Sequence, residues 1–301
     1  MSVVVASAPG KVVLSGEYAV LDGAPAVSMA VNRRARVRIA SGGAALDCLG
    51  PVAGGDTRLL DSVRQSLGIG AMDNHRIELD TREFAAIDGV TKYGLGSSAA
   101  LTAALTAALG DSGRSFEAHE ALQGRAGSGV DIATSLSGGL IAYRRDGREV
   151  TRINWPEGLF AAFLFLDRSA STGAMIAKLD PDTVDYRVLS RAAESAARAW
   201  SSGDPEAVLG ATSDYAAALG EFDSQHSIGV FEGGHAALAV QALESRVVYK
   251  PCGAGGGDVG VAFSTDGSLL DTFVEGVSDD TIRRLDLEID HHGVAVSGVI
   301  V

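Results

Sequence analysis

Residues 92–100, with the sequence KYGLGSSAA, decide the fold because they join a glycine-rich turn directly to a helix-forming run. Ala and Leu dominate residues 97–109, which predicts a helix with a serine cap at its start. Glycines in front of a helix let backbone N–H groups approach a ligand, and the positive end of the helix dipole favours an anion there. The stretch therefore predicts a phosphate-binding loop, although a tight turn before a capped helix has the same local sequence.

Two other glycine-rich stretches also contain a lysine. Residues 7–18 contain SAPGK and then GEY, and residues 250–258 read KPCGAGGGD. The chain has 21 Arg but only four Lys, and three of these, Lys11, Lys92 and Lys250, flank the glycine-rich stretches. An ammonium group binds a phosphate oxygen as a compact point charge. We therefore expect these three lysines to lie near anionic ligands.

The composition is that of a globular chain. Of the 301 residues 46% are hydrophobic and 21% are charged, and the net charge is −13. That sign repels nucleic acid and anionic membranes, so we expect neither as a partner. No apolar run approaches the ~20 residues of a membrane helix, and the first residues lack the pattern of a signal peptide. Cys48 and Cys252 make no disulfide framework and no metal-ligand set, so we expect a cytoplasmic protein with reduced thiols.

The predicted elements are strands and helices that alternate without strict βαβ repeats, which indicates an α+β fold. Apolar residues 3–8 and 11–15 predict two strands separated at Pro9-Gly10. A soft domain boundary is expected near residue 155.

A second pair of strands is predicted at residues 25–31 and 33–40. Within the latter, Arg34, Arg36 and Arg38 recur at period two and therefore share one face of the strand. We expect that face to be solvated.

Two known phosphate-loop patterns can be compared with the glycine-rich stretch at residues 92–100. A Walker A loop needs Gly-Lys followed by Ser or Thr, which this sequence does not contain. The spacing Gly94-x-Gly96-x-x-Ala99 matches a relaxed dinucleotide fingerprint. However, no buried strand is predicted before it, and the next acidic residue, Asp111, lies in a Gly/Ser turn. A dinucleotide-binding oxidoreductase is therefore a remote alternative.

The three glycine-rich stretches, in this order, resemble the signature motifs of the GHMP kinases from residue 7 to about residue 263. Within that superfamily the chain is most similar to the phosphomevalonate kinases, because Lys92 precedes the loop, residues 127–131 read GSGVD and residues 250–258 read KPCGAGGGD. The resemblance implies a two-domain α+β fold. Residues 1–155 would form a ribosomal protein S5 domain 2-like N-terminal domain and residues 156–301 a ferredoxin-like C-terminal domain, with ATP and substrate in the cleft between them.

The resemblance also implies an activity. It indicates a phosphotransferase that depends on ATP and Mg²⁺ and converts mevalonate 5-phosphate to mevalonate 5-diphosphate, in isoprenoid precursor synthesis. A mevalonate kinase or another small-molecule kinase of this superfamily is the alternative. Diphosphomevalonate decarboxylase shares the fold but fits the motifs less well, and a non-catalytic binding module is more distant. The partners would be ATP and a small phosphorylated substrate, and we expect a monomer or a homodimer.

Phosphoryl transfer depends on alignment and charge neutralisation more than on covalent chemistry. The resemblance implies that Asp131 orients the attacking oxygen, while Lys11 and Lys92 are catalytic cations on the phosphates. It places ATP on the loop residues Lys92, Gly94, Leu95, Gly96, Ser97, Ser98 and Ala99. It places the acceptor on Ser15, Glu17, Tyr18, Ser128, Gly129, Ser171, Thr172, Lys250, Gly253, Ala254, Gly255 and Gly256.

Magnesium is expected at Ser98 and Glu120. Glu120 stands eleven residues before Asp131, where mevalonate kinases have a metal-binding Glu. An exposed helix charge is an equal interpretation of Glu120.

Two features depart from the family pattern. Cys252 stands where a serine is expected before the third glycine run, and a thiol is a poor hydrogen-bond donor. Residues 41–75, where related kinases carry adenine-side structure, are compact and rich in Gly and Ala. The preferred nucleotide base and the acceptor therefore stay open.

Overall fold

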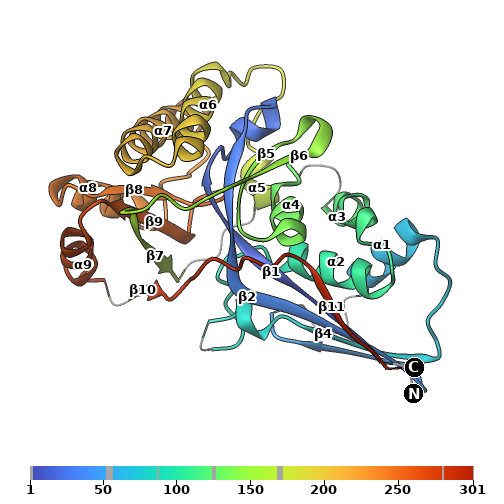
Figure 1. Ribbon diagram of the computed structural model, residues 1–301. Helices are drawn as coiled ribbons and strands as arrows, with labels where there is room; N and C mark the ends of the chain where they lie inside the picture. The colour runs from blue at the N-terminus through green and yellow to red at the C-terminus, as the bar shows by residue number, and fades with distance from the viewer. Residues whose placement is uncertain are drawn as a thin grey trace. The chain divides into compact units, whose positions relative to one another are not determined.

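The computed structural model describes residues 3–51, 57–86, 88–123, 127–167, 172–279 and 281–300. They form two compact units (Figure 1). Unit 1 consists of Met1–Lys11, Met29–Gly139 and Glu288–Val301, and unit 2 of Val12–Ser28 and Leu140–Leu287. Both units are discontinuous in sequence, which differs from the single boundary expected near residue 155. The last residues of the chain return to unit 1.

The sheet of unit 1 has the strand order β11-β1-β2-β4-β3. Strand β1 pairs antiparallel with β11, and β2 with β4, while β3 and β4 are parallel. The strands are β1 (Val3–Ser15), β2 (Ala26–Ser41), β3 (Ala45–Leu49), β4 (His75–Asp80) and β11 (Ala295–Ile300). Strand β3 was not predicted.

The predicted breaks in the first two long strands are wrong, because β1 and β2 are each continuous. A Cβ built on Gly10 would lie 2.6 Å from the carbonyl oxygen of Leu95 and 2.6 Å from the Phe84 ring. The glycine therefore permits close packing rather than a turn. Pro9 lacks only its own N–H donor, which a strand can tolerate at one position.

Four helices of unit 1 lie together on one side of the sheet (Figure 1). They are α1 (Arg58–Leu67), α2 (Ser97–Ala108), α3 (Ser115–Gln123) and α4 (Val130–Ser137). Helix α2 packs against the other three and against β11. Its residues from Ala99 to Thr106 are all buried, which explains why Ala and Leu occupy every side of this helix. The helix predicted at residues 97–109 is confirmed.

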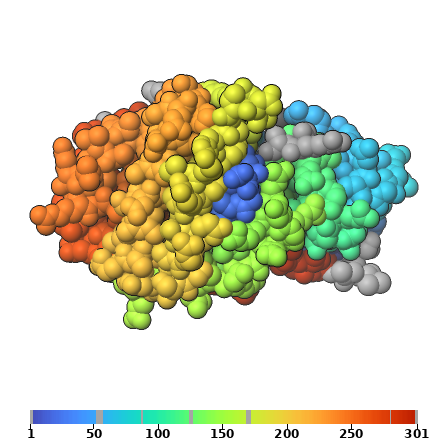
Figure 2. All heavy atoms as spheres, turned by 90° about the horizontal axis from the view of Figure 1, so that it is seen from above, coloured from blue at the N-terminus to red at the C-terminus, as the bar shows by residue number. Residues whose placement is uncertain are grey.

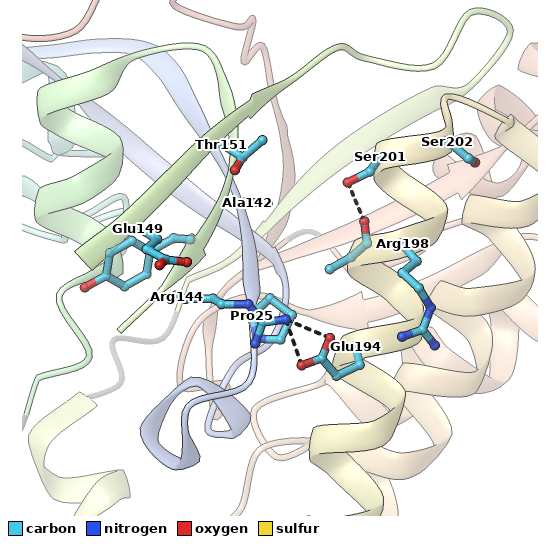
Figure 3. A pocket seen from close by; sticks show the side chains of 11 residues that line it. Pro25, Ala142, Arg144, Glu149, Thr151, Glu194, Arg198, Ser201 and Ser202 are labelled. Carbon is cyan, nitrogen blue, oxygen red and sulfur yellow. Dashed lines mark hydrogen bonds and ion pairs between the residues drawn. The ribbon is translucent and has the colours of Figure 1, made fainter. Parts of the chain in front are cut away.

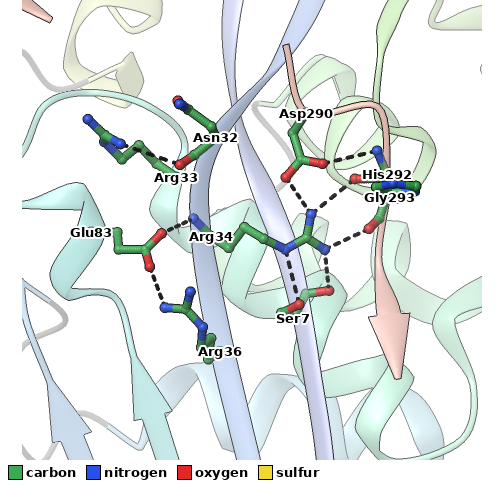
Figure 4. A network of polar contacts seen from close by, with 9 residues as sticks. All are labelled: Ser7, Asn32, Arg33, Arg34, Arg36, Glu83, Asp290, His292 and Gly293. Atoms are coloured by element: carbon green, nitrogen blue, oxygen red, sulfur yellow. Dashed lines mark hydrogen bonds and ion pairs between the residues drawn. The ribbon is translucent and has the colours of Figure 1, made fainter. Parts of the chain in front are cut away.

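Arg34 corrects the expectation of a solvated arginine face (Figure 4). Its guanidinium donates to Ser7 Oγ and Ser7 O, to Asp290 Oδ2 at 2.5 Å, and to the carbonyl oxygens of His292 and Gly293. The Arg34 side chain is only 18% exposed, while Arg36 and Arg38 are exposed as expected. Arg34 therefore fastens the C-terminal segment to β1 and β2.

Unit 2 contains a β-hairpin and a four-stranded antiparallel sheet of order β10-β7-β9-β8. The hairpin strands are β5 (Leu140–Arg144) and β6 (Glu149–Ile153). The sheet strands are β7 (Phe160–Leu166), β8 (Val248–Pro251), β9 (Asp258–Ser264) and β10 (Ile282–Leu285). The helices are α5 (Thr172–Ile176), α6 (Arg187–Ser202), α7 (Pro205–His226), α8 (His235–Glu244) and α9 (Gly267–Glu275).

Two apolar clusters of described residues lie in unit 2. One lies between the four-stranded sheet and helices α8 and α9. The other joins α6, α7 and the 3-10 helix Ala19–Asp22, which appears at the surface as a blue patch beside the yellow α6 in Figure 2. Among the described residues, no helix is both long and apolar enough to cross a membrane.

Candidate active site

The predicted phosphate loop leads directly into α2. Gly94 and Gly96 have φ of 74° and 77°, in the left-handed region that favours glycine. Gly96, rather than the expected serine, is the N-cap, and no side chain caps the helix. The backbone N–H of Lys11 donates to Leu95 O at 2.8 Å, which attaches the first glycine motif to this loop. An uncapped helix start with an attached lysine is suited to an anion.

Lys11 and Asp131 meet beside Gly96. Lys11 Nζ lies 3.4 Å from Asp131 Oδ1, and the two side chains are 9% and 31% exposed. A Cβ built on Gly96 would lie 3.1 Å from Lys11 Cε and 3.7 Å from Asp131 Oδ2. Residues 120 positions apart in sequence are thus brought together by tertiary structure. The absence of a side chain at Gly96 therefore lets the Lys11 side chain pack directly over the loop.

Asp131 belongs to the first turn of α4. The N-cap Gly129 has φ of 83°, and the Val130 N–H donates to Ser128 Oγ at 3.3 Å. This turn contains the GSGVD motif of residues 127–131. The positive end of the helix dipole stabilises a carboxylate at this position. Asp131 is therefore held by its helix while its carboxylate stays partly exposed.

A histidine that the sequence analysis missed contacts the loop. His119 Nε2 lies 3.0 Å from Ser98 Oγ, and His119 is only 4% exposed. Burial lowers the pKa of His119, although the nearby charges of Asp131 and Glu120 oppose this effect. The neighbouring Glu120 and the loop lysine Lys92 are both exposed.

Unit 2 contains the remaining glycine motif and a buried ion pair. Lys250 Nζ lies 2.5 Å from Glu17 Oε1 and donates to Pro251 O at 2.6 Å. The two side chains are 0% and 3% exposed. Tyr215 donates to the Glu17 carbonyl at 2.8 Å, and the ammonium lies 5.9 Å from the centre of the Tyr215 ring. The ammonium group of Lys250 therefore interacts with a carboxylate, a carbonyl oxygen and an aromatic ring of the protein itself.

Side chains from elsewhere in unit 2 donate hydrogen bonds to backbone carbonyl groups of the glycine loop that follows Lys250. Tyr18 donates to Ala254 O at 2.6 Å, and His235 Nε2 lies 2.9 Å from Gly257 O. His235 Nδ1 lies 2.7 Å from Tyr249 Oη. Burial lowers the pKa of His235 to about 4, so the ring is neutral near pH 7 and donates from Nε2. Gly255 has φ of 74°, and a Cβ there would collide with the Val230 backbone.

The other predicted acceptor residues are less informative. Ser15 Oγ and Glu17 Oε2 are buried with no hydrogen-bond partner among the described residues. Thr172 is exposed at the start of α5, and Ser171 lies outside the described residues. Gly253 and Gly256 continue the same left-handed loop. The acceptor role of these residues stays a prediction.

A pocket of about 460 Å³ in unit 2 contains none of the predicted site residues (Figure 3). It lies between the β5–β6 hairpin and α6. Its Arg144 pairs with Glu194 at 2.9 Å, so this cation is already neutralised. Among the described residues, no group of three or more His, Cys, Asp or Glu side chains is arranged to hold a metal ion.

Comparisons with known proteins agree with the motifs. No family model matches the chain. Phosphomevalonate kinase of Streptomyces sp. (strain CL190) is 29% identical over 334 residues, which cover 86% of this chain and 89% of that protein. The fold agrees with that of the Lin0012 protein from Listeria innocua, with a TM-score of 0.81, 21% identity and coverage of 98% and 99% of the two chains.

A second solved structure is that of Streptococcus pneumoniae phosphomevalonate kinase in complex with phosphomevalonate and AMPPNP. Its TM-score is 0.75 at 18% identity, with coverage of 95% of this chain and 99% of that one. The strand pairs described above, which are antiparallel apart from the β3–β4 pair, and this shared fold differ from the doubly wound parallel sheet on which the dinucleotide-binding alternative depends. The three ordered glycine motifs, the two-domain α+β fold and a relative along most of the sequence together make the chain similar to the GHMP kinases, and to the phosphomevalonate kinases among them.

Proposed function

We propose that the protein transfers the γ-phosphoryl group of ATP to mevalonate 5-phosphate, which yields mevalonate 5-diphosphate and ADP. The observation that carries this proposal is the meeting of Lys11 and Asp131 beside Gly96, at the uncapped start of α2. The 29% identity to a phosphomevalonate kinase supports the choice of acceptor.

In the proposed reaction an oxygen of the acceptor phosphate attacks the γ-phosphorus, and the bond from that phosphorus to the bridging oxygen of ADP breaks. A phosphate monoester is largely ionised near pH 7, because its second pKa is ~6. The acceptor therefore needs alignment and charge neutralisation more than a strong base. Asp131 would orient the acceptor, and Lys11 would neutralise the charge that gathers between the two phosphate groups.

The loop supports the nucleotide part of the proposal. The first N–H groups of α2 and the exposed Lys92 suit the phosphates of ATP. The hydroxyl of Ser98 suits Mg²⁺, which prefers oxygen ligands and is commonly held through nucleotide phosphates. Magnesium would stabilise negative charge on those phosphates. The Glu120 carboxylate is exposed and fits this role less well. A cytoplasmic location and a monomeric or dimeric state stay predictions.

An ADP-release assay with ATP and Mg²⁺ tests the proposed function. The acceptors to compare are mevalonate, mevalonate 5-phosphate, mevalonate diphosphate, homoserine and galactose. Mevalonate 5-phosphate should have the highest kcat/KM. A higher value with mevalonate would indicate a mevalonate kinase instead. Release of CO₂ from mevalonate diphosphate would indicate a decarboxylase, and no turnover with any acceptor would favour a binding module.

A further inference from the structure

Helix α3 contacts the predicted phosphate loop through His119, a residue that lies outside the three glycine-rich motifs. His119 lies 12 residues before Asp131, one position away from the expected metal-binding Glu120. One position rotates a side chain by about 100° around a helix, since a turn contains 3.6 residues. His119 consequently faces α2 and is buried, while Glu120 faces outward and is exposed. His119 therefore reaches the loop from α3 through its contact with Ser98.

The partner of His119 is a hydroxyl whose direction matters to the loop. Ser98 lies in the first turn of α2, and it does not cap that helix. Its backbone carbonyl accepts a hydrogen bond from Thr102 Oγ1 at 2.8 Å, so the backbone at this position is fixed. The side chain still has three staggered rotamers. The contact of 3.0 Å between Ser98 Oγ and His119 Nε2 selects one of them.

We propose that His119 is a positioning residue that accepts a hydrogen bond from the Ser98 hydroxyl and thereby directs the serine oxygen toward the magnesium nucleotide. A hydroxyl has one hydrogen and two lone pairs. When the hydrogen points to Nε2, the lone pairs point away from α3 and are available to a cation or to a phosphate-bound water. The proposal relies on the proposed function only in requiring that the loop binds a magnesium nucleotide.

The alternative is that His119 only fills the interface between α2 and α3. A second contact between the same helices allows the two roles to be separated. Thr106 Oγ1 lies 2.6 Å from Ser115 Oγ, and both residues are fully buried. Thr106→Val removes this contact far along α2 from the loop. It is therefore a control for the loss of a buried hydrogen bond between the two helices, and it also removes the contacts of Thr106 Oγ1 with the carbonyl oxygens of Thr102 and Ala103 within α2.

The decisive variants are His119→Gln and His119→Asn. Both introduce an amide, but the longer Gln places its oxygen near the position of Nε2, whereas Asn is too short to reach Ser98. Calorimetry with AMPPNP, with Mg²⁺ and with EDTA, measures nucleotide binding independently of turnover. We expect His119→Asn to weaken binding of Mg–AMPPNP about tenfold, with little change in EDTA. His119→Gln should stay within threefold of wild type, as should Thr106→Val.

Ser98→Ala completes the test. It should weaken Mg–AMPPNP binding about as much as His119→Asn, and the double variant should be no weaker than Ser98→Ala alone. Thermal unfolding verifies that each variant is folded, and His119→Leu replaces His119→Asn if the latter does not fold. Equal Mg–AMPPNP binding by His119→Asn and Thr106→Val would overturn the proposal. So would additive losses in the double variant. Neither outcome depends on which acceptor the enzyme phosphorylates.

Discussion

The protein contains two lysine–carboxylate pairs that look alike in sequence and differ in structure. Each lysine flanks a glycine-rich motif, and each pairs with an acid far away along the chain. Lys11 and Asp131 in unit 1 are separated by 3.4 Å, with Asp131 31% exposed. Lys250 and Glu17 in unit 2 are separated by 2.5 Å, and neither side chain is more than 3% exposed. Burial, rather than residue type, distinguishes the two pairs.

This difference assigns them different tasks. A partly exposed pair retains its affinity for an incoming ligand, and its mutual attraction contributes little to stability. A buried pair has already lost its water, so each charge depends on the other. The contacts of Lys250 and Tyr18 with carbonyls of the third glycine loop indicate that the buried pair and its neighbours hold that loop. We therefore expect substitutions in the first pair to affect catalysis, and substitutions in the second to affect folding.

The largest expected effect is that of Asp131→Asn on turnover. Loss of the orienting carboxylate should lower kcat roughly 10³-fold, within the range typical of acid–base groups. The free energy of unfolding should change less than it does in Lys250→Met, because the Asp131 carboxylate is 31% exposed to water. Steady-state kinetics and urea unfolding measure the two quantities.

Lys11→Ala sharpens the same test. It should also lower kcat, and it should weaken binding of mevalonate 5-phosphate, since it removes a cation from the proposed site. Asp131→Asn should leave that binding equal or slightly tighter. Turnover by Asp131→Asn at close to the wild-type rate would reduce Asp131 to a stabilising charge at the start of α4.

The next largest effect is that of Lys250→Met on stability. It leaves Glu17 buried without its partner, which typically costs about 3–5 kcal/mol of the free energy of unfolding. Adding Glu17→Gln should restore part of that loss. Arg144→Met is the control in the same unit, because the pair with Glu194 is 41% and 37% exposed and should contribute about 1 kcal/mol or less. Unchanged stability of Lys250→Met, together with lost acceptor binding, would instead make Lys250 a ligand residue.

A smaller effect concerns pH and the buried His235. Its pKa is about 4 in the folded protein, against 6.5 for an ordinary histidine. Between pH 4 and pH 6.5 the unfolded chain binds a proton at His235 and the folded chain does not. The contribution of His235 to the free energy of unfolding is therefore complete above pH 6.5 and decreases as the pH falls toward 4. From pH 7 to pH 5 this residue should remove about 2 kcal/mol.

Urea unfolding of wild type and His235→Gln at several pH values tests this effect. The variant should be less stable than wild type at pH 7 but should lose about 2 kcal/mol less on acidification to pH 5. Parallel stability profiles of the two proteins would show that His235 does not titrate in this range.

The smallest effect is expected for Gly96→Ala in the phosphate loop. The added Cβ would press on Lys11 at 3.1 Å, at a φ of 77° that Ala rarely adopts. We expect nucleotide binding to weaken about tenfold, equivalent to about 1.4 kcal/mol. Gly110→Ala is the matched control, because Gly110 has a similar positive φ of 94° but no atom within 4 Å of the added Cβ. Equal nucleotide affinity of the two variants would contradict the close approach of ligand and loop.

Local signals in the sequence predicted most of the elements near the site. The helix at residues 97–109 follows from the helix propensity of its Ala and Leu residues. The continuity of β1 did not, because Pro9-Gly10 is a turn signal that close packing against Leu95 and Phe84 explains equally well. The burial of His119 could have been inferred from the sequence of the predicted helix. Residues 115, 118 and 119 are spaced at the helical repeat and share the buried face of α3, whereas Glu120 lies outside that face.

The sequence by itself was enough to predict the resemblance to the GHMP kinases, the glycine-rich loop before α2 and the residues from which a site could be built, because these depend on short-range backbone geometry and on ordered motifs. Only the tertiary structure decided which charged residues remain accessible. Lys11 meets Asp131, while Lys250 meets Glu17 across 233 positions of sequence. Desolvation of an ion pair depends on every segment packed around it, and no local pattern contains that information. A lysine beside a glycine-rich loop therefore forms an ion pair with a partly exposed carboxylate in unit 1 and a fully buried ion pair in unit 2.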